Sequence, residues 1–227
     1  MARSQLLKDL VGSNADLESV LTRLKIILTD IDNELLMNWI DGELRGYTEN
    51  HELPGYRTIS GVIIGTYVIN YRTQYTNSEV PLELLLSQEM VDEIKVVNIT
   101  DGIASIQKLL NGESRDRYAK QIPTAFCHKI SKGTFQIAQM RVNIPSNNVE
   151  GIVANVKSKL VDVVMELEKQ FDNLDDLDIK SQVEEDQIKR EQVIYNIGQI
   201  VYEGSVEIGD GNKIKKSGIG KWLGGEK

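Results

Sequence analysis

The apolar pattern of this chain changes character between Trp39 and Arg57, in the sequence WIDGELRGYTENHELPGYR. Before this segment, apolar residues recur three or four positions apart, and after it Val, Ile, Thr and Tyr dominate. The first pattern is typical of an amphipathic helix, and the second is typical of a strand. Because two glycines and a Leu-Pro-Gly sequence lie between them, the segment predicts a junction between a helical layer and a sheet.

Helical periodicity predicts helices on both sides of the strand-like region. Ser4 is a predicted N-cap for a short helix that ends at Val11, and Asp16 is one for a long helix that continues to Trp39. A second long helix is predicted from Asn147 or Asn148, through residues 149–171. Both long helices have one apolar face, so we expect each to be half buried.

Strand-forming residues gather in the middle of the chain. Residues 57–75 predict one bent strand or two strands, with Gly61 and Gly65 as candidate bulges. Residues 124–130 and 134–144 predict a hairpin closed by a Ser-Lys-Gly turn. The expected fold class is therefore α+β, in which a small antiparallel sheet packs against long amphipathic helices.

The C-terminal part of the sequence differs from the rest. Residues 173–192 are highly charged and predict an exposed helical linker after an α+β domain that spans residues 1–172. Residues 193–227 are rich in glycine, have strand character from Ile194 to Ile208 and end in a basic segment. An isolated hairpin is marginal in water. We therefore expect this separate β-prone tail to need a partner surface, for which a second copy of the chain is the candidate.

Composition narrows the classes of function. The formal charge of -8 and the pI near 5.0 argue against broad binding to nucleic acid, which is not an expected partner. The single cysteine, Cys127, excludes an intrachain disulfide framework and a Cys-rich metal site, and it favours a reducing, cytoplasmic setting. The N-terminal sequence lacks the apolar core of a secretion signal, and no run approaches a bilayer-spanning length. We expect a soluble protein without a membrane partner.

Familiar catalytic and cofactor motifs do not identify a reaction. The sequence contains no GxGxxG, Walker phosphate loop or HExxH helix, so no cofactor is expected and the catalytic residues are unknown. Cys127 and His128 are neighbours on a predicted strand, whose alternate side chains point to opposite faces, so a catalytic pair of these two is disfavoured. The acidic run at residues 172–178 lacks the spacing of a calcium loop, and no metal site is expected.

The junction segment holds the candidate functional residues, which are Trp39, Glu43, Tyr47, Tyr56 and Arg57. One interpretation is a structural clasp, in which a buried bridge from Glu43 to Arg57 and the tyrosine hydroxyls pin a helix to the sheet. The other is a groove in which arginine and tyrosine side chains bind a nucleotide, a phosphate or a peptide. The sequence leaves both interpretations open.

Three short motifs in the N-terminal part carry a family resemblance. They are S-x-L-L-K-D-L at residues 4–10, W-I-D-G-E-L-R-G-Y at 39–47 and L-P-G-Y-R at 53–57. Together they resemble the signature of the AbiTii family, a bacterial abortive-infection domain, from Ser4 to about Phe171. The resemblance implies phage resistance through arrest or death of the infected cell, and it brings no established catalytic residues. The positions that match are Trp39, Glu43, Leu44, Gly46, Tyr47, Leu53, Pro54, Tyr56 and Arg57.

Two functions are consistent with the resemblance and the residues. The first is an interaction or sensor-effector module that acts through protein contacts and self-association, with a homo-oligomer formed by the C-terminal tail and a phage or host protein as candidate partner. The alternative is a nuclease or nucleotide-processing toxin that uses Glu43, His51, Tyr56 and Arg57. One carboxylate and one loop histidine are too few groups to specify a reaction, so the first function is preferred.

Overall fold

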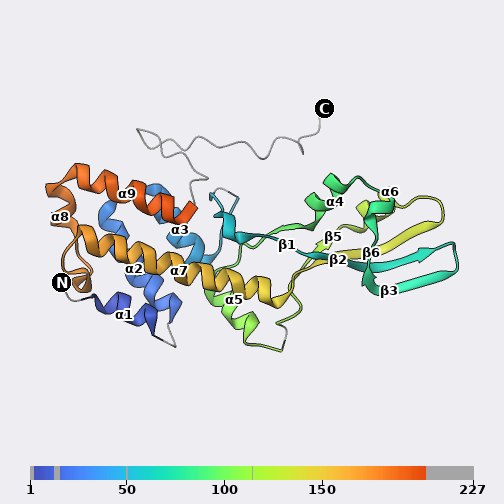
Figure 1. Ribbon diagram of the computed structural model, residues 1–227, viewed down its shortest axis with the longest axis horizontal. Coiled ribbons are helices and arrows are strands. Elements are labelled where there is room, and N and C mark those ends of the chain that lie inside the picture. The colour runs from blue at the N-terminus through green and yellow to red at the C-terminus, as the bar shows by residue number, and fades with distance from the viewer. Residues whose placement is uncertain (1–2, 13–15, 50, 114, 203–227) are drawn as a thin grey trace. The chain divides into compact units, whose positions relative to one another are not determined.

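The computed structural model describes residues 3–12, 16–49, 51–113 and 115–202, and it divides into two compact units (Figure 1). The helical unit comprises the described residues up to Gly55, the segment Thr100–Ala104 and the described residues from Ala154 onwards. The sheet unit comprises Tyr56–Ile99 and Ser105–Val153. Helices and small antiparallel sheets together make the fold α+β, which confirms the predicted class.

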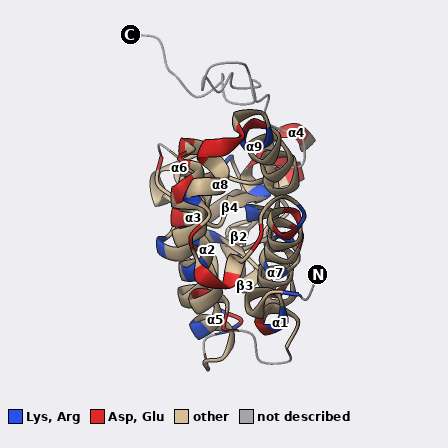
Figure 2. Cartoon of the chain, turned by 90° about the vertical axis from the view of Figure 1, so that its left-hand side faces the viewer, with Lys and Arg blue, Asp and Glu red and all other residues tan. Residues whose placement is uncertain are grey.

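The helical unit is built from amphipathic helices whose apolar faces are buried. Its elements are α1 (Gln5–Val11), α2 (Leu17–Ile31), α3 (Glu34–Arg45), most of α7 (Ser146–Gln170), the 3-10 turn η3 (Leu174–Asp176), α8 (Lys180–Glu185) and α9 (Gln187–Tyr202). The predicted caps are confirmed for the first two helices, because Ser4 Oγ accepts a hydrogen bond from Leu7 N–H and Asp16 Oδ1 accepts one from Ser19 N–H. Both signs of charge are spread over the helices of this unit (Figure 2).

The prediction of one continuous helix from Asp16 to Trp39 is wrong, because the chain turns between α2 and α3. Asp32 adopts a left-handed conformation with φ of 51°. Asn33 then caps α3, since its Oδ1 accepts a hydrogen bond from Leu36 N–H at 3.1 Å. Asp and Asn side chains compete with helical backbone bonds in this way. The apolar spacing continues through the turn, so periodicity alone did not reveal it.

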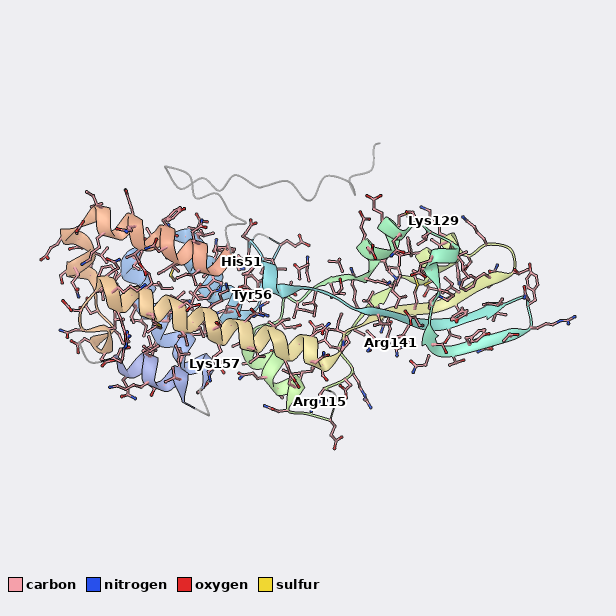
Figure 3. The ribbon with its side chains drawn as sticks, viewed as in Figure 1. His51, Tyr56, Arg115, Lys129, Arg141 and Lys157 are labelled. Carbon is pink, nitrogen blue, oxygen red and sulfur yellow. The ribbon has the colours of Figure 1, made fainter. Side chains whose placement is uncertain are left out.

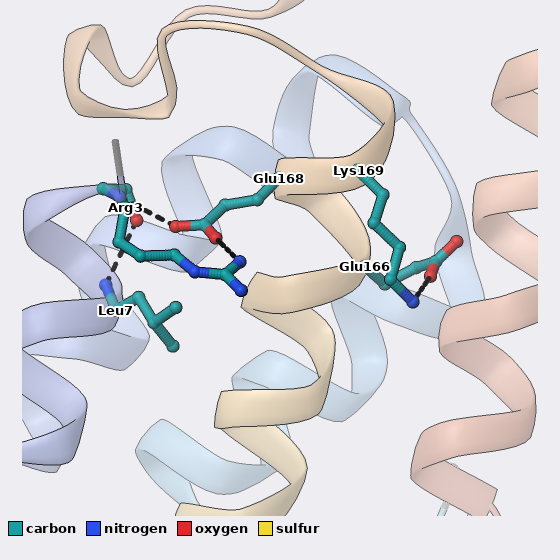
Figure 4. Close-up of polar contacts among 6 residues, drawn as sticks. Arg3, Leu7, Glu166, Glu168 and Lys169 are labelled. Carbon is teal, nitrogen blue, oxygen red and sulfur yellow. Dashed lines mark hydrogen bonds and ion pairs between the residues drawn. The ribbon is translucent and has the colours of Figure 1, made fainter. Parts of the chain in front are cut away.

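Two carboxylates near the C-terminal end of α7 fasten this helix to its neighbours (Figure 4). Glu168 accepts hydrogen bonds from the backbone N–H of Ser4 at 2.8 Å and from Arg3 Nη1 at 2.7 Å. Glu166 accepts one from Asn196 Nδ2 of α9 at 2.7 Å, and Lys169 Nζ lies 3.1 Å from its other oxygen. The chain segments before α1 and within α9 are thereby held to α7.

These contacts predict a dependence of stability on pH. Burial alone would raise the pKa of Glu166 and of Glu168, but the hydrogen bonds just described outweigh it and hold each pKa below the ordinary value of 4.5. Their contribution to stability is therefore present above the unfolded-state pKa and is lost as the pH falls through the lower native pKa. We expect Glu168→Gln to lower the free energy of unfolding by about 1 kcal/mol at neutral pH and to match the parent protein in acid.

Urea unfolding of both proteins across this pH range measures the effect. Glu184→Gln is the matched control, because that carboxylate is exposed and lies 4.0 Å from Lys180, and its removal should leave the free energy of unfolding nearly unchanged. If the free energies of unfolding of Glu168→Gln and the parent differ by the same amount at neutral and acidic pH, the ionised Glu168 carboxylate is not the cause of the difference.

The sheet unit contains two antiparallel sheets. The larger has the strand order β3-β2-β6-β5, and β1 pairs with β4 in the smaller. The strands are β1 (Thr58–Ser60), β2 (Val62–Ile69), β3 (Thr73–Glu79), β4 (Val96–Asn98), β5 (Ala119–Ile122) and β6 (Phe135–Asn143). The remaining elements in the described part of the chain are the 3-10 turns η1 (Gly55–Arg57) and η2 (Leu82–Leu84) and the helices α4 (Gln88–Lys95), α5 (Ile103–Leu110) and α6 (Thr124–Ile130). A register shift follows Gly65, as expected for the bulge predicted there. Gly61 is instead the residue between β1 and β2, which belong to different sheets.

The predicted hairpin of residues 124–130 and 134–144 is wrong in its first strand. Residues 124–130 form the helix α6, which follows Pro123 and buries Cys127 and Ile130. Pro favours the start of a helix, and three-residue spacing places those two side chains on one face. The second strand is confirmed as β6, which pairs with β2 and β5 instead. The polar segment before Pro123 contributes β5.

The predicted strand from Ile194 to Ile208 is also wrong as far as Tyr202. These residues belong to α9, which buries Val193, Ile194, Ile197, Val201 and Tyr202. The apolar residues of this segment fit both the three- and four-residue spacing of a helix and the alternation of a strand. Packing in the helical unit decides in favour of the helix. The remainder of the predicted tail, residues 203–227, lies outside the described residues. The predicted domain limits at 172 and 192 stay a prediction.

No helix in the described part of the chain combines the length and the apolarity that crossing a bilayer requires.

Candidate functional site

The N-terminal half of the junction segment lies on the last turns of α3. Trp39 and Glu43, four positions apart, share one face of this helix, and neither has measurable solvent exposure. Tyr47, which is also buried, donates a hydrogen bond from its hydroxyl to Glu43 Oε1 at 2.7 Å. A buried carboxylate needs such donors, because leaving it unsolvated is costly. The structure therefore brings together three of the predicted site residues.

Two glycines explain how Tyr47 reaches Glu43. A Cβ atom at Gly42 would lie 2.3 Å from the Tyr47 ring, so the ring packs directly on the backbone of α3. Gly46 ends the helix with φ of 98°, a conformation that favours glycine, and its N–H donates to the Gly42 carbonyl at 2.9 Å. Gly46 therefore turns the backbone at the end of α3, and Gly42 leaves room for the Tyr47 ring. The chain folds back so that Tyr47 packs against α3 and its hydroxyl reaches Glu43.

A segment distant in sequence packs against this return. Tyr47 N–H donates to the Thr100 carbonyl at 2.7 Å. An added Cβ at Gly46 would lie 2.8 Å from that same oxygen, and one at Gly102 would lie 2.7 Å from the Leu44 carbonyl. The end of α3 and residues 100–102 therefore meet backbone to backbone. The sequence did not predict this contact, because nothing local in either segment indicates the other.

Tyr202 is the buried residue near Glu43 that sequence reasoning missed. Burial is the main cause that raises the pKa of its hydroxyl, and the negative charges of Glu52 and Glu43 raise the pKa further. We call Glu43, Tyr47 and Tyr202 the Glu43 cluster. The helical spacing of Ile194, Ile197 and Val201 was the signal that could have placed Tyr202 on a packed helix rather than in a tail.

His51 lies in the turn that follows α3 (Figure 3). Its backbone N–H donates to the Thr48 carbonyl at 3.0 Å, and Thr48 N–H donates to His51 Nδ1 at 3.3 Å. The ring meets Tyr47 edge-on, with 6.3 Å between centroids. Because Nδ1 accepts a hydrogen bond in this arrangement, the proton of the neutral ring lies on Nε2. His51 thus closes its own turn.

The last two residues of the junction segment, Tyr56 and Arg57, belong to the sheet unit. Arg57 ends the 3-10 turn η1 and is fully buried. Tyr56, which is labelled in Figure 3, precedes it and is half buried. The Arg57 carbonyl accepts a hydrogen bond from Ile99 N–H at 2.8 Å, which aligns β1 with β4. The predicted bridge between Glu43 and Arg57 joins residues of different units and stays a prediction.

Burial limits the chemistry that the charged candidate residues can offer. The two charged candidate residues, Glu43 and Arg57, have 0% exposed surface. Carboxylates of the acidic run after α7 accept hydrogen bonds from backbone groups. Asp175 accepts one from Gln5 N–H, and Asp178 accepts one from Lys180 N–H. Within the described ranges, no group of three or more His, Cys, Asp or Glu side chains could hold a metal ion.

Comparison with known proteins adds one family. The AbiTii family model matches residues 4–193, a range that contains both motifs of the junction segment, α8 and the start of α9. No curated protein matches the chain, and no solved structure does.

Proposed function

Because the chain belongs to the AbiTii family, we propose that it serves antiphage defence as an interaction or sensor-effector module. The family indicates a role in abortive infection, in which the infected cell stops growing or dies. The protein acts in the cytoplasm through contacts with a phage or host protein and through self-association. The alternative, a nuclease or nucleotide-processing toxin with Glu43, His51, Tyr56 and Arg57, would need these residues to meet a substrate.

The burial of three candidate residues of the family motifs is the observation that supports this proposal. Trp39, Glu43 and Arg57 are fully buried, and the Glu43 carboxylate receives the Tyr47 hydroxyl. A catalytic carboxylate or a phosphate-binding arginine must touch the substrate. Side chains enclosed in this way suit a scaffold, and recognition then falls to residues on the surface of each unit.

Self-association is proposed for the segment after α9. Because residues 193–202 form part of that helix and are packed in the helical unit, the candidate segment for assembly begins at residue 203. Its basic end and its glycines are evident in the sequence. A second copy of the chain is the proposed partner of this segment.

Deletion of residues 203–227 tests the proposal. We expect the truncated protein to keep its far-UV circular dichroism, since α9 stays complete, and to have a lower molar mass in light scattering than the full chain. We also expect cells that carry the truncated protein to lose protection against a phage that the full chain resists. The matched control replaces residues 203–227 by a Gly-Ser sequence of equal length, and it should behave as the truncated protein does. An oligomeric state that is unchanged by both alterations would refute tail-driven assembly.

A further inference from the structure

A groove of about 490 Å³ opens in the sheet unit, and none of the residues that line it belongs to the Glu43 cluster. Strand β4, helix α5 and the chain that enters β5 contribute to its wall. Ligand pockets in proteins commonly measure roughly 300–1,000 Å³, so this groove is large enough for a small molecule. The lining residues that matter here are Val97, Asn98, Leu109, Arg117, Tyr118 and Lys120.

The polar side chains of this wall favour an anion. Its residues include no Asp or Glu. Arg117 and Lys120 are exposed, and neither forms an ion pair or a side-chain hydrogen bond with any other described residue. Nearby cations are already engaged, because Arg115 lies 3.0 Å from Glu150 and Arg141 donates to Asn77 at 2.6 Å (Figure 3). The two groove cations therefore keep their donors for a ligand.

Charge is distributed unevenly along the sequence. The whole chain carries 26 Lys or Arg and 34 Asp or Glu, but residues 105–153 carry seven of the first kind and three of the second. The groove takes both of its cations from this basic segment. A cleft with one sign of charge concentrates ligands of the opposite sign, even on a protein with a net negative charge.

The remaining wall of the groove suits a flat apolar group. Val97 is buried, and Leu109 and Tyr118 are half buried. The Asn98 carboxamide is oriented because its Oδ1 accepts a hydrogen bond from Thr58 Oγ1 at 3.0 Å, which leaves its N–H groups as donors. One groove thus offers charged donors, an amide donor and an apolar surface together.

We propose that this groove binds a nucleoside phosphate. Arg117 and Lys120 contact phosphate oxygens, for which guanidinium and ammonium groups are well suited. The base packs on Leu109 and Tyr118, because every nucleobase presents an apolar face. The ligand is a free nucleotide or the end of a single strand, and both present the same phosphate and base. This site requires neither self-association nor the junction segment, so it goes beyond the proposed function.

Titration calorimetry on the full chain tests the proposal at a fixed ionic strength of about 0.1 M, since phosphate binding depends on salt. The probes are ATP, GTP, pyrophosphate and a short single-stranded oligonucleotide. We expect at least one nucleotide to bind, and Arg117→Gln/Lys120→Gln to weaken its binding by about 100-fold, or about tenfold for each cation. The absence of binding by every probe would overturn the proposal.

The matched control removes the same charge outside the groove. Arg115→Gln/Lys129→Gln changes two exposed cations that do not line it, and it should leave the affinity within about twofold, because screened surface charges contribute little. Equal weakening by both double variants would overturn a specific site. Circular dichroism and thermal unfolding check that both variants are folded.

The probes separate the parts of the proposal and the two sources of ligand. Tighter binding of a nucleotide than of pyrophosphate supports the base contact, whereas equal binding overturns it. Tighter binding of the oligonucleotide than of the nucleotide, lost in Arg117→Gln/Lys120→Gln, identifies a strand end as the ligand. A nucleotide that binds at least as tightly as the oligonucleotide identifies a free nucleotide.

Discussion

Replacement of Gly42 by alanine is expected to lower the free energy of unfolding of the helical unit by about 2 kcal/mol, although alanine is the better helix former. The added methyl group would lie 2.3 Å from the Tyr47 ring. That ring cannot simply move away, because the Tyr47 hydroxyl is bonded to Glu43 and its backbone N–H to the Thr100 carbonyl. Relief of the overlap therefore disrupts either a buried hydrogen bond or the packing of residues 100–102.

Gly151→Ala is the matched control for this substitution. Gly151 also lies inside a helix, α7, but nothing lies within 4 Å of a Cβ atom added there. The same chemical change should then raise the free energy of unfolding by about 0.5–1 kcal/mol, the usual gain of alanine over glycine in a helix. If overlap with the Tyr47 ring is responsible, urea unfolding should show that Gly42→Ala lowers the free energy of unfolding and that Gly151→Ala raises it.

A double-mutant cycle identifies the cause directly. In a Tyr47→Ala background the ring is absent, so Gly42→Ala should become neutral or stabilising there. A loss of stability that is equally large with and without the ring would exclude steric overlap as its cause. The cycle also distinguishes the explanation from a general intolerance of this helix to substitution.

Local signals in the sequence predicted much of the helical structure. Ser4 and Asp16 are caps whose side chains accept backbone hydrogen bonds as expected. The sequence misleads where one set of apolar positions fits both a strand and a helix, as in residues 124–130 and 194–202. Packing against the rest of the protein then decides which of the two forms. Asp32 and Asn33 interrupt a helix whose apolar spacing continues on both sides, so the pattern could not reveal the break.

The candidate site was predictable only in its local part. Helical spacing places Trp39 and Glu43 on one face, and the structure buries both there. The sequence predicts the two glycines only as part of a junction, because their steric role depends on the packing of Tyr47 against α3. Two segments reach this region over long sequence separations, because the Thr100 carbonyl accepts a hydrogen bond from Tyr47 N–H and α9, which ends at Tyr202, packs against α3. No local propensity encodes such contacts.

Deletion of residues 193–227 is expected to unfold the helical unit, in contrast to deletion of residues 203–227. The longer deletion removes five buried side chains of α9, which are Val193, Ile194, Ile197, Val201 and Tyr202. Burial of an aliphatic or aromatic side chain contributes about 1.5–3 kcal/mol, so the loss is on the order of 10 kcal/mol. The whole stability of a domain is about 5–15 kcal/mol. The deletion also removes Asn196, which donates a hydrogen bond to the buried Glu166.

Far-UV circular dichroism and limited proteolysis of the two deletion variants measure this difference. The longer deletion should lose helical signal and become rapidly cleaved, while the shorter one should resemble the full chain. A folded, protease-resistant protein without residues 193–227 would contradict the packing of α9. The contrast matters for the functional test, because an unfolded helical unit would lose assembly and defence for reasons unrelated to the tail. Only the deletion that begins at residue 203 therefore separates self-association from folding.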